Sequence, residues 1–137
     1  MQMSDTNLVH VRDEADIVDA RQVGREMAEN VGIAGTDVTL VTTAISEVAR
    51  NIISYATAGE IELTIVDESG RHGLRIIARD SGPGIEDVET ALADGYSSAD
   101  GLGLGLPGAR RLMDDFEVDS AVGEGTTVTM TKWRGER

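Results

Sequence analysis

The sequence predicts an α+β fold: a two-layer sandwich in which a mixed, mostly antiparallel sheet carries its helices on one face. Three observations lead to this prediction. Apolar residues recur at helical spacing in two long segments of the N-terminal half, and then at a period of two in two pairs of later segments. The two helical segments are grouped instead of alternating with the strands, as in α+β folds. The 137 residues contain no linker-like stretch, so we expect one domain over residues 1–137.

The first predicted elements are a strand over Asn7–Arg12 and a helix over Asp13–Val31. Asp13 is a residue type that is favoured at helix N-caps. Gly32 is typical of the position just after the last helical turn. The apolar face of this helix consists of Val23, Met27 and Val31, each four residues after the one before.

A second helix is predicted to begin at Thr36 or Asp37 and to end near Tyr55. Its apolar stripe consists of Val41, Ile45, Val48 and Ile52. After this helix, apolar residues recur at every second position. Ile61, Leu63 and Ile65 alternate with polar residues, and so do the apolar residues of 74–80 across the turn ESGRHG. These two segments predict an antiparallel hairpin.

The last third of the chain begins with a long irregular segment over Ser81–Leu106, which is expected to hold one short helix around residues 87–93. Pro107 suits the first turn of a further helix. We expect that helix to carry Leu112, Met113 and Phe116. A final hairpin is predicted from strands over 117–122 and 126–133, joined by the turn GEG.

Composition restricts the function. The net charge of -13, from 25 acidic and 12 basic residues, argues against nucleic acid as a partner. No apolar run approaches the roughly 20 residues that span a membrane, so we expect no membrane contact. The absence of cysteine and of a signal-like N-terminus fits a cytoplasmic protein.

Eleven of the 12 basic residues are arginine, and the single lysine, Lys132, lies close to the C-terminus. A P-loop and a eukaryotic-type kinase site, which both need a lysine within their motifs, are therefore excluded.

Two motifs place carboxylates at positions that could carry chemistry. Glu47 and Asn51 lie four apart on the second helix and therefore share a face. A carboxylate beside an amide can hold a hydrated magnesium ion or orient a water, but the same spacing also fits a solvated helix surface. Asp80 precedes Gly82 and Gly84 at the end of a strand, where its carboxylate could accept a hydrogen bond from the amino group of adenine. This second motif is equally compatible with a simple turn.

Two glycine motifs follow. Gly101, Gly103 and Gly105 precede a predicted helix, which is a suitable arrangement for binding phosphate. A dinucleotide-binding fingerprint is disfavoured because no strand precedes the loop, and a mobile surface loop is the other reading. Gly125 and Thr126 enter the last strand, and this pair is also compatible with an ordinary hairpin turn.

The order of the four motifs resembles the GHKL family of ATPases and kinases, whose ATP-binding domain is known as the Bergerat fold. Within it, the chain is similar to the bacterial anti-sigma serine/threonine-protein kinases, and most of all to the switch kinases of the stressosome. The segments AISEVARNI, RDSGPGI and DGYSSADGLGLGLPGARRLMDDF and the terminal KW carry this likeness, which extends over nearly the whole chain.

The resemblance implies a role for each motif. Asn51 would hold the Mg²⁺ ion that bridges the phosphates of ATP, and Glu47 would be the catalytic base. Asp80 would bind the adenine amino group with the help of Thr126. The segment of about 85–105 would be the ATP lid. The glycines would line the pocket, with Gly82 and Gly84 at its floor and Gly101, Gly103 and Gly105 at the phosphates. The positive charge at the γ-phosphate could come from Arg50 or from a lid residue, which leaves its source open.

The resemblance further implies ATP- and Mg²⁺-dependent phosphorylation of a STAS-domain regulator in a bacterial partner-switching pathway, with a phosphatase or cyclase as a possible downstream partner. The alternative is an anti-sigma factor that sequesters a sigma subunit, with kinase activity secondary or absent. A third reading, an interaction module that has lost ATP binding, is disfavoured by the intact motif residues. A histidine kinase does not fit, because His10 lies in a strand-like segment and His72 lies in a turn.

Overall fold

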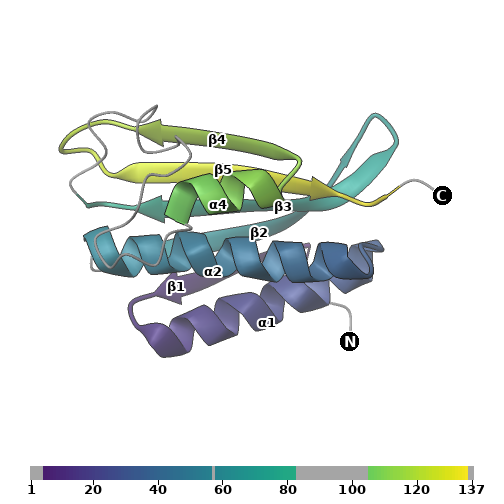
Figure 1. Cartoon of the computed structure of the whole chain (residues 1–137), viewed down its shortest axis with the longest axis horizontal. Helices are drawn as coiled ribbons and strands as arrows, with labels where there is room; N and C mark the ends of the chain where they lie inside the picture. The colour runs from purple at the N-terminus through teal and green to yellow at the C-terminus, as the bar shows by residue number, and fades with distance from the viewer. Residues whose placement is uncertain (1–4, 57, 83–104, 136–137) are drawn as a thin grey trace.

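The computed structural model describes residues 5–56, 58–82 and 105–135 of the chain (Figure 1). Three helices and five strands lie within these residues. In chain order they are β1 (Thr6–Val11), α1 (Glu14–Val31), α2 (Thr36–Ala56), β2 (Gly59–Glu68), β3 (Arg71–Asp80), α4 (Gly105–Leu112), β4 (Asp115–Ser120) and β5 (Thr126–Trp133).

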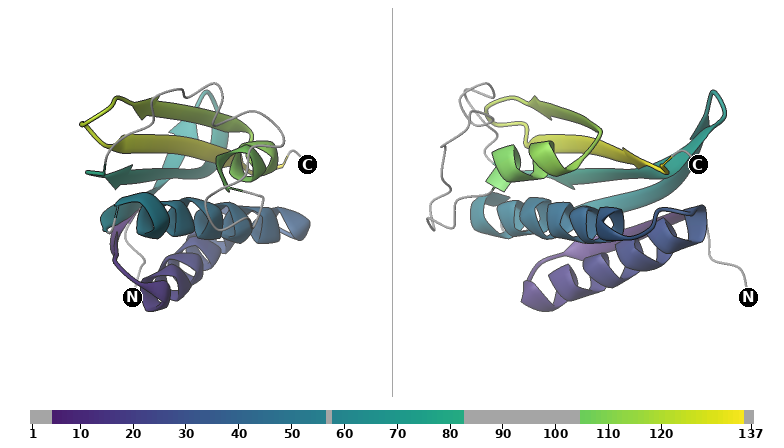
Figure 2. Two further views of the ribbon diagram at one scale, coloured as in Figure 1. Left: turned by 60° about the vertical axis from the view of Figure 1, so that its left-hand side comes forward. Right: turned by 45° about the vertical axis from the view of Figure 1, so that its right-hand side comes forward.

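The five described strands form one sheet in the order β1-β2-β3-β5-β4, and each strand runs antiparallel to its neighbours. The helices α1, α2 and α4 all lie on one face of this sheet (Figure 2). The predicted two-layer α+β sandwich is therefore confirmed. Because β5 pairs with β3, the last hairpin extends the sheet beyond the first one, with β4 at the outer edge.

The core lies between α2 and the sheet. The predicted stripe of α2 is fully packed, since Val41, Ile45, Val48 and Ile52 are each at most 2% exposed. The apolar residues of β2 and β3 that face it are also buried, and they are Ile61, Leu63, Leu74, Ile76 and Ala78. Each fully buried aliphatic side chain contributes about 1.5–3 kcal/mol through burial. This packing fixes the orientation of α2, and therefore the direction in which its polar residues point.

The predicted cap of α1 is confirmed as a capping box. The Asp13 side chain accepts a hydrogen bond from the Asp16 backbone N–H at 3.3 Å, and the Asp16 carboxylate accepts one from the Asp13 N–H at 3.3 Å. Two of the donors that a helix start leaves without a partner are satisfied in this way. Gly32, with a φ of 102°, ends the helix in the left-handed conformation that glycine tolerates best.

The boundary between α4 and β4 differs from the prediction. Pro107 lies in the first turn of α4 as expected, but the helix ends at Leu112, so Met113 and Phe116 lie outside it and Phe116 belongs to β4. Lys132 from β5 donates to the Leu112 carbonyl at 3.1 Å, so a residue from outside the local sequence binds the last carbonyl of the helix. β4 then begins two residues earlier than predicted and ends at Ser120. The short helix expected around residues 87–93 lies outside the described residues.

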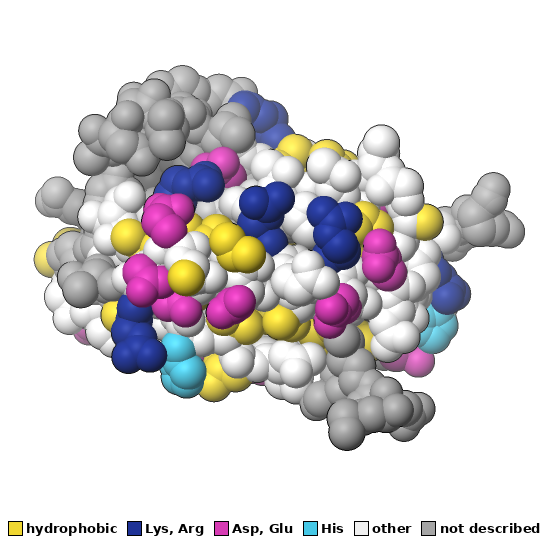
Figure 3. Space-filling model, turned by 90° about the horizontal axis from the view of Figure 1, so that it is seen from below, with side chains coloured by type: hydrophobic (Ala, Val, Ile, Leu, Met, Phe, Trp, Pro, Cys, Tyr) yellow, Lys and Arg dark blue, Asp and Glu magenta, His cyan; other side chains and the backbone are white. Residues whose placement is uncertain are grey.

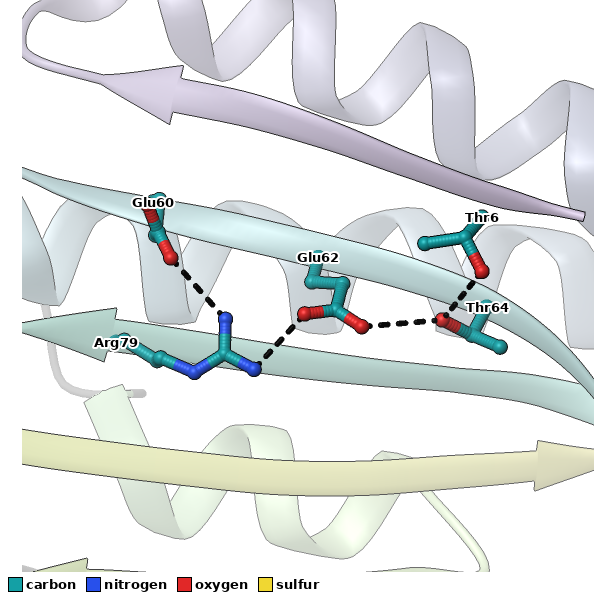
Figure 4. A network of polar contacts seen from close by, with 5 residues as sticks. All are labelled: Thr6, Glu60, Glu62, Thr64 and Arg79. Atoms are coloured by element: carbon teal, nitrogen blue, oxygen red, sulfur yellow. Dashed lines mark hydrogen bonds and ion pairs between the residues drawn. The ribbon is translucent and has the colours of Figure 1, made fainter. Parts of the chain in front are cut away.

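The outer face of the sheet, opposite the helices, carries a network of polar side chains (Figure 4). The guanidinium of Arg79 donates to Glu60 at 3.1 Å and to Glu62 at 2.8 Å. The hydrogen bond that Arg79 donates to Glu62 is the main cause that raises the pKa of Arg79 above its ordinary value. Arg79 also lines an open cavity of about 680 Å³ together with His10, Arg12 and Asp80. These contacts hold Arg79 on the side of the sheet that faces away from α2.

Seen from below, the molecule shows acidic and basic side chains interspersed with small hydrophobic areas (Figure 3). The net charge of -13 therefore does not appear on this face as a continuous acidic surface. Across the described residues, each helix is too short or too polar to cross a membrane.

Candidate functional site

Asp80 lies at the last position of β3, flanked on both sides by a neighbouring strand. Its backbone is in register with Gly59 of β2 and with Thr126 of β5. Ile76 and Ala78, which precede it at a spacing of two, are buried under the helices, so the half-buried Asp80 side chain points to the same side. The Gly82 N–H donates to its Oδ1 at 2.9 Å. This bond forms the turn that the sequence allowed, and it also orients the carboxylate.

The C-terminal half of α2 meets this end of the sheet. A Cβ atom built on Gly59 would lie 3.1 Å from the Cβ of Asp80 and 3.0 Å from the Cγ2 of Ile52. Glu47 and Asn51 lie on the same part of α2 and are both partly buried. Figure 1 shows α2 and β3 ending, and β5 beginning, on the same side of the molecule. The predicted residues of α2, β3 and β5 are therefore brought to one end of the fold.

Thr126 is held by a residue that the sequence analysis missed. It is only 6% exposed, and its Oγ1 shares a hydrogen bond of 2.8 Å with the Oγ of Ser120. The Ser120 hydroxyl also contacts the Gly125 carbonyl at 3.0 Å. Ser120 and Thr126 are direct partners in the β4–β5 register. Only that pairing reveals the role of Ser120, because no motif marks the residue in the sequence.

Gly125 is a second residue whose role the sequence did not reveal. Its φ is 84°, and a Cβ atom at this position would lie only 2.1 Å from the carbonyl oxygen of Asp80. Real side chains do not approach a backbone oxygen so closely. The glycine therefore allows the start of β5 to pack directly against the backbone of Asp80. From the sequence alone, Gly125 is predicted only to belong to a hairpin turn and a Gly-Thr motif.

Replacing Gly125 by alanine is expected to destabilise the fold and to disturb Asp80. Gly123 offers a matched control, because its φ is 83° but a Cβ there would have no neighbour within 4 Å. Gly123→Ala should cost about 1 kcal/mol from the left-handed backbone alone. Gly125→Ala adds the steric conflict and should cost about 2–4 kcal/mol. Thermal and urea unfolding of both variants measures the difference, and equal losses would contradict the close packing described here.

Glu47 has a basic neighbour one helical turn away. The Nη1 of Arg50 lies 3.5 Å from the Oε2 of Glu47. The Glu47 side chain is 12% exposed and the Arg50 side chain is 36% exposed, so the carboxylate is the more enclosed member of the pair. Arg50 therefore places a positive charge beside the predicted base.

The donor set near Asn51 suits a magnesium ion that arrives with a nucleotide. Among the residues that the structure describes, no three His, Cys, Asp or Glu side chains gather closely enough to hold a metal ion. Mg²⁺ is commonly bound through one or two protein oxygens, with water and phosphate oxygens as the other ligands. The amide oxygen of Asn51, with the carboxylate of Glu47 nearby, fits that mode of binding.

Several predicted residues fall outside the described part of the chain. They are Gly84, Gly101 and Gly103, together with the lid segment of about 85–105 except for its last residue. Gly105 is described as the first residue of α4. The residues that follow it, Leu106 to Ala109, are buried, and α4 packs against α2. The predicted phosphate loop therefore leads into a helix that is anchored beside the element carrying Glu47 and Asn51.

The chain is similar to proteins of known family. A family model described as a histidine kinase-like ATPase domain matches residues 11–132. The serine/threonine-protein kinase RsbT of Bacillus subtilis is 49% identical over 131 residues, which cover 96% of this chain and 98% of RsbT. The anti-sigma F factor of Thermoanaerobacter sp. (strain X514) is 31% identical over 120 residues, or 85% of this chain and 84% of the relative.

A solved structure supports the fold. The crystal structure of the RsbU and RsbW domains of a Mycobacterium tuberculosis protein superposes with a TM-score of 0.63 at 19% sequence identity. The match covers 96% of this chain and 34% of the solved chain, so the likeness concerns about a third of that larger protein. At 19% identity, the similarity concerns the fold alone, that is, the arrangement of helices and strands.

Proposed function

The chain belongs to the family of histidine kinase-like ATPase domains, and from this membership we infer that it is a serine/threonine-protein kinase that uses ATP. The observation that carries this conclusion is the 49% identity with RsbT, a serine/threonine-protein kinase, over nearly the full length of both chains. The site is consistent with it, because Asp80 pairs with Thr126 at the end of the sheet where the C-terminal half of α2, the helix that carries Glu47 and Asn51, comes close.

We propose that this end of the sheet binds the adenine of ATP through Asp80. The carboxylate would accept a hydrogen bond from the exocyclic amino group of the base, which offers a donor at that edge. Its orientation is supported by the bond from Gly82 to Oδ1. Thr126, held by Ser120, would complete the recognition of the base from β5. The glycines at 101, 103 and 105 would contact the phosphates.

Phosphoryl transfer would take place at α2. Asn51 would hold a magnesium ion, which neutralises charge on the phosphate oxygens when it is bound. Glu47 would accept the proton of the attacking serine or threonine hydroxyl. A base in this role must lie within hydrogen-bond reach of the nucleophile in the complex, and the partial burial of Glu47 limits competition by water. The main contribution of the protein would be to position the reactants.

The proposed substrate is a STAS-domain regulator in a bacterial partner-switching pathway, and a downstream phosphatase or cyclase is a further proposed partner. The alternative is that the chain acts chiefly as an anti-sigma factor. That alternative is favoured by relatives named anti-sigma F factor, which are 31% identical over 85% of this chain and 34% identical over 70% of it. RsbT is closer in both identity and coverage, so the kinase is the first proposal.

A direct assay distinguishes the kinase proposal from the anti-sigma proposal. The purified protein is incubated with Mg²⁺ and ATP labelled at the γ-phosphate, together with STAS-domain proteins or with sigma subunits. Transfer of label to serine or threonine of a STAS-domain protein is the expected result. If no label is transferred and the protein forms a stable complex with a sigma subunit, the anti-sigma function replaces the kinase. If neither occurs, both proposals are wrong.

A further inference from the structure

Arg50 is the only basic residue of α2, and it directly precedes Asn51. Its guanidinium contacts Glu47, the residue to which the proposed function gives the role of base. A positively charged side chain at this position must either fix that carboxylate permanently or exchange it for another anion. The geometry of the pair distinguishes between these two roles. The inference below rests on the proposed function.

The contact between Arg50 and Glu47 is loose. The shortest distance between their charged atoms is 3.5 Å, whereas Arg79 on the outer face holds its two glutamates at 3.1 and 2.8 Å. Arg50 is also 36% exposed, so its long side chain can reorient in solvent. Exposed ion pairs of this kind contribute little to stability. A guanidinium binds phosphate oxygens more strongly, because it can donate two parallel hydrogen bonds to them.

Several other basic residues of the described chain are bound elsewhere or lie away from the predicted phosphate glycines. The Lys132 side chain is 10% exposed, donates to the carbonyl of Leu112 and lies 3.6 Å from Asp114. Arg79 is held on the opposite face of the sheet. Arg110 and Arg111 belong to the last turn of α4, about 8–9 Å along the helix axis from Gly105. Arg50 is the basic side chain that contacts Glu47, and it precedes Asn51 on the same helix.

We propose that Arg50 exchanges its anion when ATP binds, leaving Glu47 and binding the γ-phosphate. The exchange supplies positive charge to the phosphoryl group and leaves the carboxylate of Glu47 able to accept a proton. In the transfer step, the oxygen of the substrate hydroxyl forms a bond to the γ-phosphorus, and its proton passes to Glu47. The bond between the γ-phosphorus and the bridging oxygen breaks, and ADP leaves with the electron pair.

The preference for ATP over ADP tests this exchange without any protein substrate. Dissociation constants for both nucleotides are measured by calorimetry with Mg²⁺ for the wild type, Arg50→Gln and Arg50→Lys. Arg50→Gln is expected to weaken ATP binding about tenfold with little effect on ADP, and Arg50→Lys should retain part of the preference. The matched control is Arg25→Gln, which removes an exposed arginine from α1 and should leave both constants unchanged.

The Glu47→Gln variant tests the other half of the exchange. Without the carboxylate, Arg50 no longer has to leave an anionic partner, so ATP affinity should rise about two- to five-fold and ADP affinity should not change. Combining Glu47→Gln with Arg50→Gln should abolish this gain. A double variant that keeps the gain would contradict the proposal, because the effect would then not depend on Arg50.

An unchanged ratio of ATP to ADP affinity in Arg50→Gln overturns the proposed exchange but leaves the kinase proposal intact. A wild-type protein that binds neither nucleotide would instead overturn the proposed function itself. Melting temperature and ADP binding establish whether each variant is folded. If Arg50→Gln is not folded, Arg50→Met keeps the length of the side chain without its charge, and the same loss of ATP preference is expected from it.

Discussion

Replacing Asp80 by asparagine is expected to weaken the binding of ATP and of ADP alike by about 10- to 150-fold, as measured by calorimetry. The adenine base is common to both nucleotides, so losing its contact should not change the preference between them. The physical reason is that a carboxylate is a stronger acceptor than an amide, and that a wrongly oriented amide would face the adenine amino group with a donor of its own.

The substitution should leave the fold intact. The side-chain oxygen of asparagine can still accept the hydrogen bond from Gly82, which reaches Oδ1 of Asp80 at 2.9 Å. Asp119→Asn, on the exposed outer side of β4, serves as a control of equal charge change. If Asp80→Asn melts at the wild-type temperature and binds nucleotide with wild-type affinity, Asp80 does not recognise adenine and the proposed site is wrong.

Replacing Glu47 by glutamine is expected to reduce phosphoryl transfer by about 10²- to 10⁴-fold without weakening the binding of nucleotide. Glutamine keeps the shape of the side chain but cannot take up the proton of the attacking hydroxyl. The measurement is the single-turnover rate of label transfer to the protein substrate, beside calorimetric binding of ATP. Glu47→Ala should behave in the same way in the transfer assay.

A loss of transfer must be distinguished from a loss of structure or of substrate docking. Glu29→Gln, on the exposed side of α1, makes the same chemical change at a distance and should transfer phosphate at the wild-type rate. Binding of the substrate protein to Glu47→Gln is measured separately and should be retained. Transfer at the wild-type rate by Glu47→Gln would show that another group accepts the proton.

The parts of the fold that depend on a local pattern in the sequence could be predicted correctly. The stripe of α2 from Val41 to Ile52 and the cap at Asp13 depend on residues that are near one another in the chain, and both are confirmed. The end of α4 could not be predicted in the same way. Leu112 and Phe116 stand at helical spacing, but Lys132, which donates to the carbonyl of Leu112 where the helix ends, comes from 20 residues further along the chain. Contacts of this kind carry no local signal.

The same distinction between local pattern and distant contacts applies to the candidate site. The order of the motifs and the family resemblance selected Glu47 and Asn51 in one motif, Asp80 in a second and Thr126 in a third, and the roles of these residues stay predictions. The support that Ser120 and Gly125 give was missed, since Ser120 acts through its pairing with Thr126 and Gly125 through its packing against the backbone of Asp80. The loose pair of Arg50 and Glu47 also required the structure, because spacing alone does not give the distance between the two charges.

The central claim is that Asn51, Asp80 and Thr126 belong to one nucleotide site at one end of the sheet. The most direct test is to follow backbone amide signals by NMR while a non-hydrolysable ATP analogue is added with Mg²⁺. We expect saturable shifts at Gly82, Asn51 and Thr126, with the indole N–H of Trp133 near the C-terminus unaffected. Saturable shifts confined to the surroundings of Trp133, or no saturable shift at all, would contradict the claim.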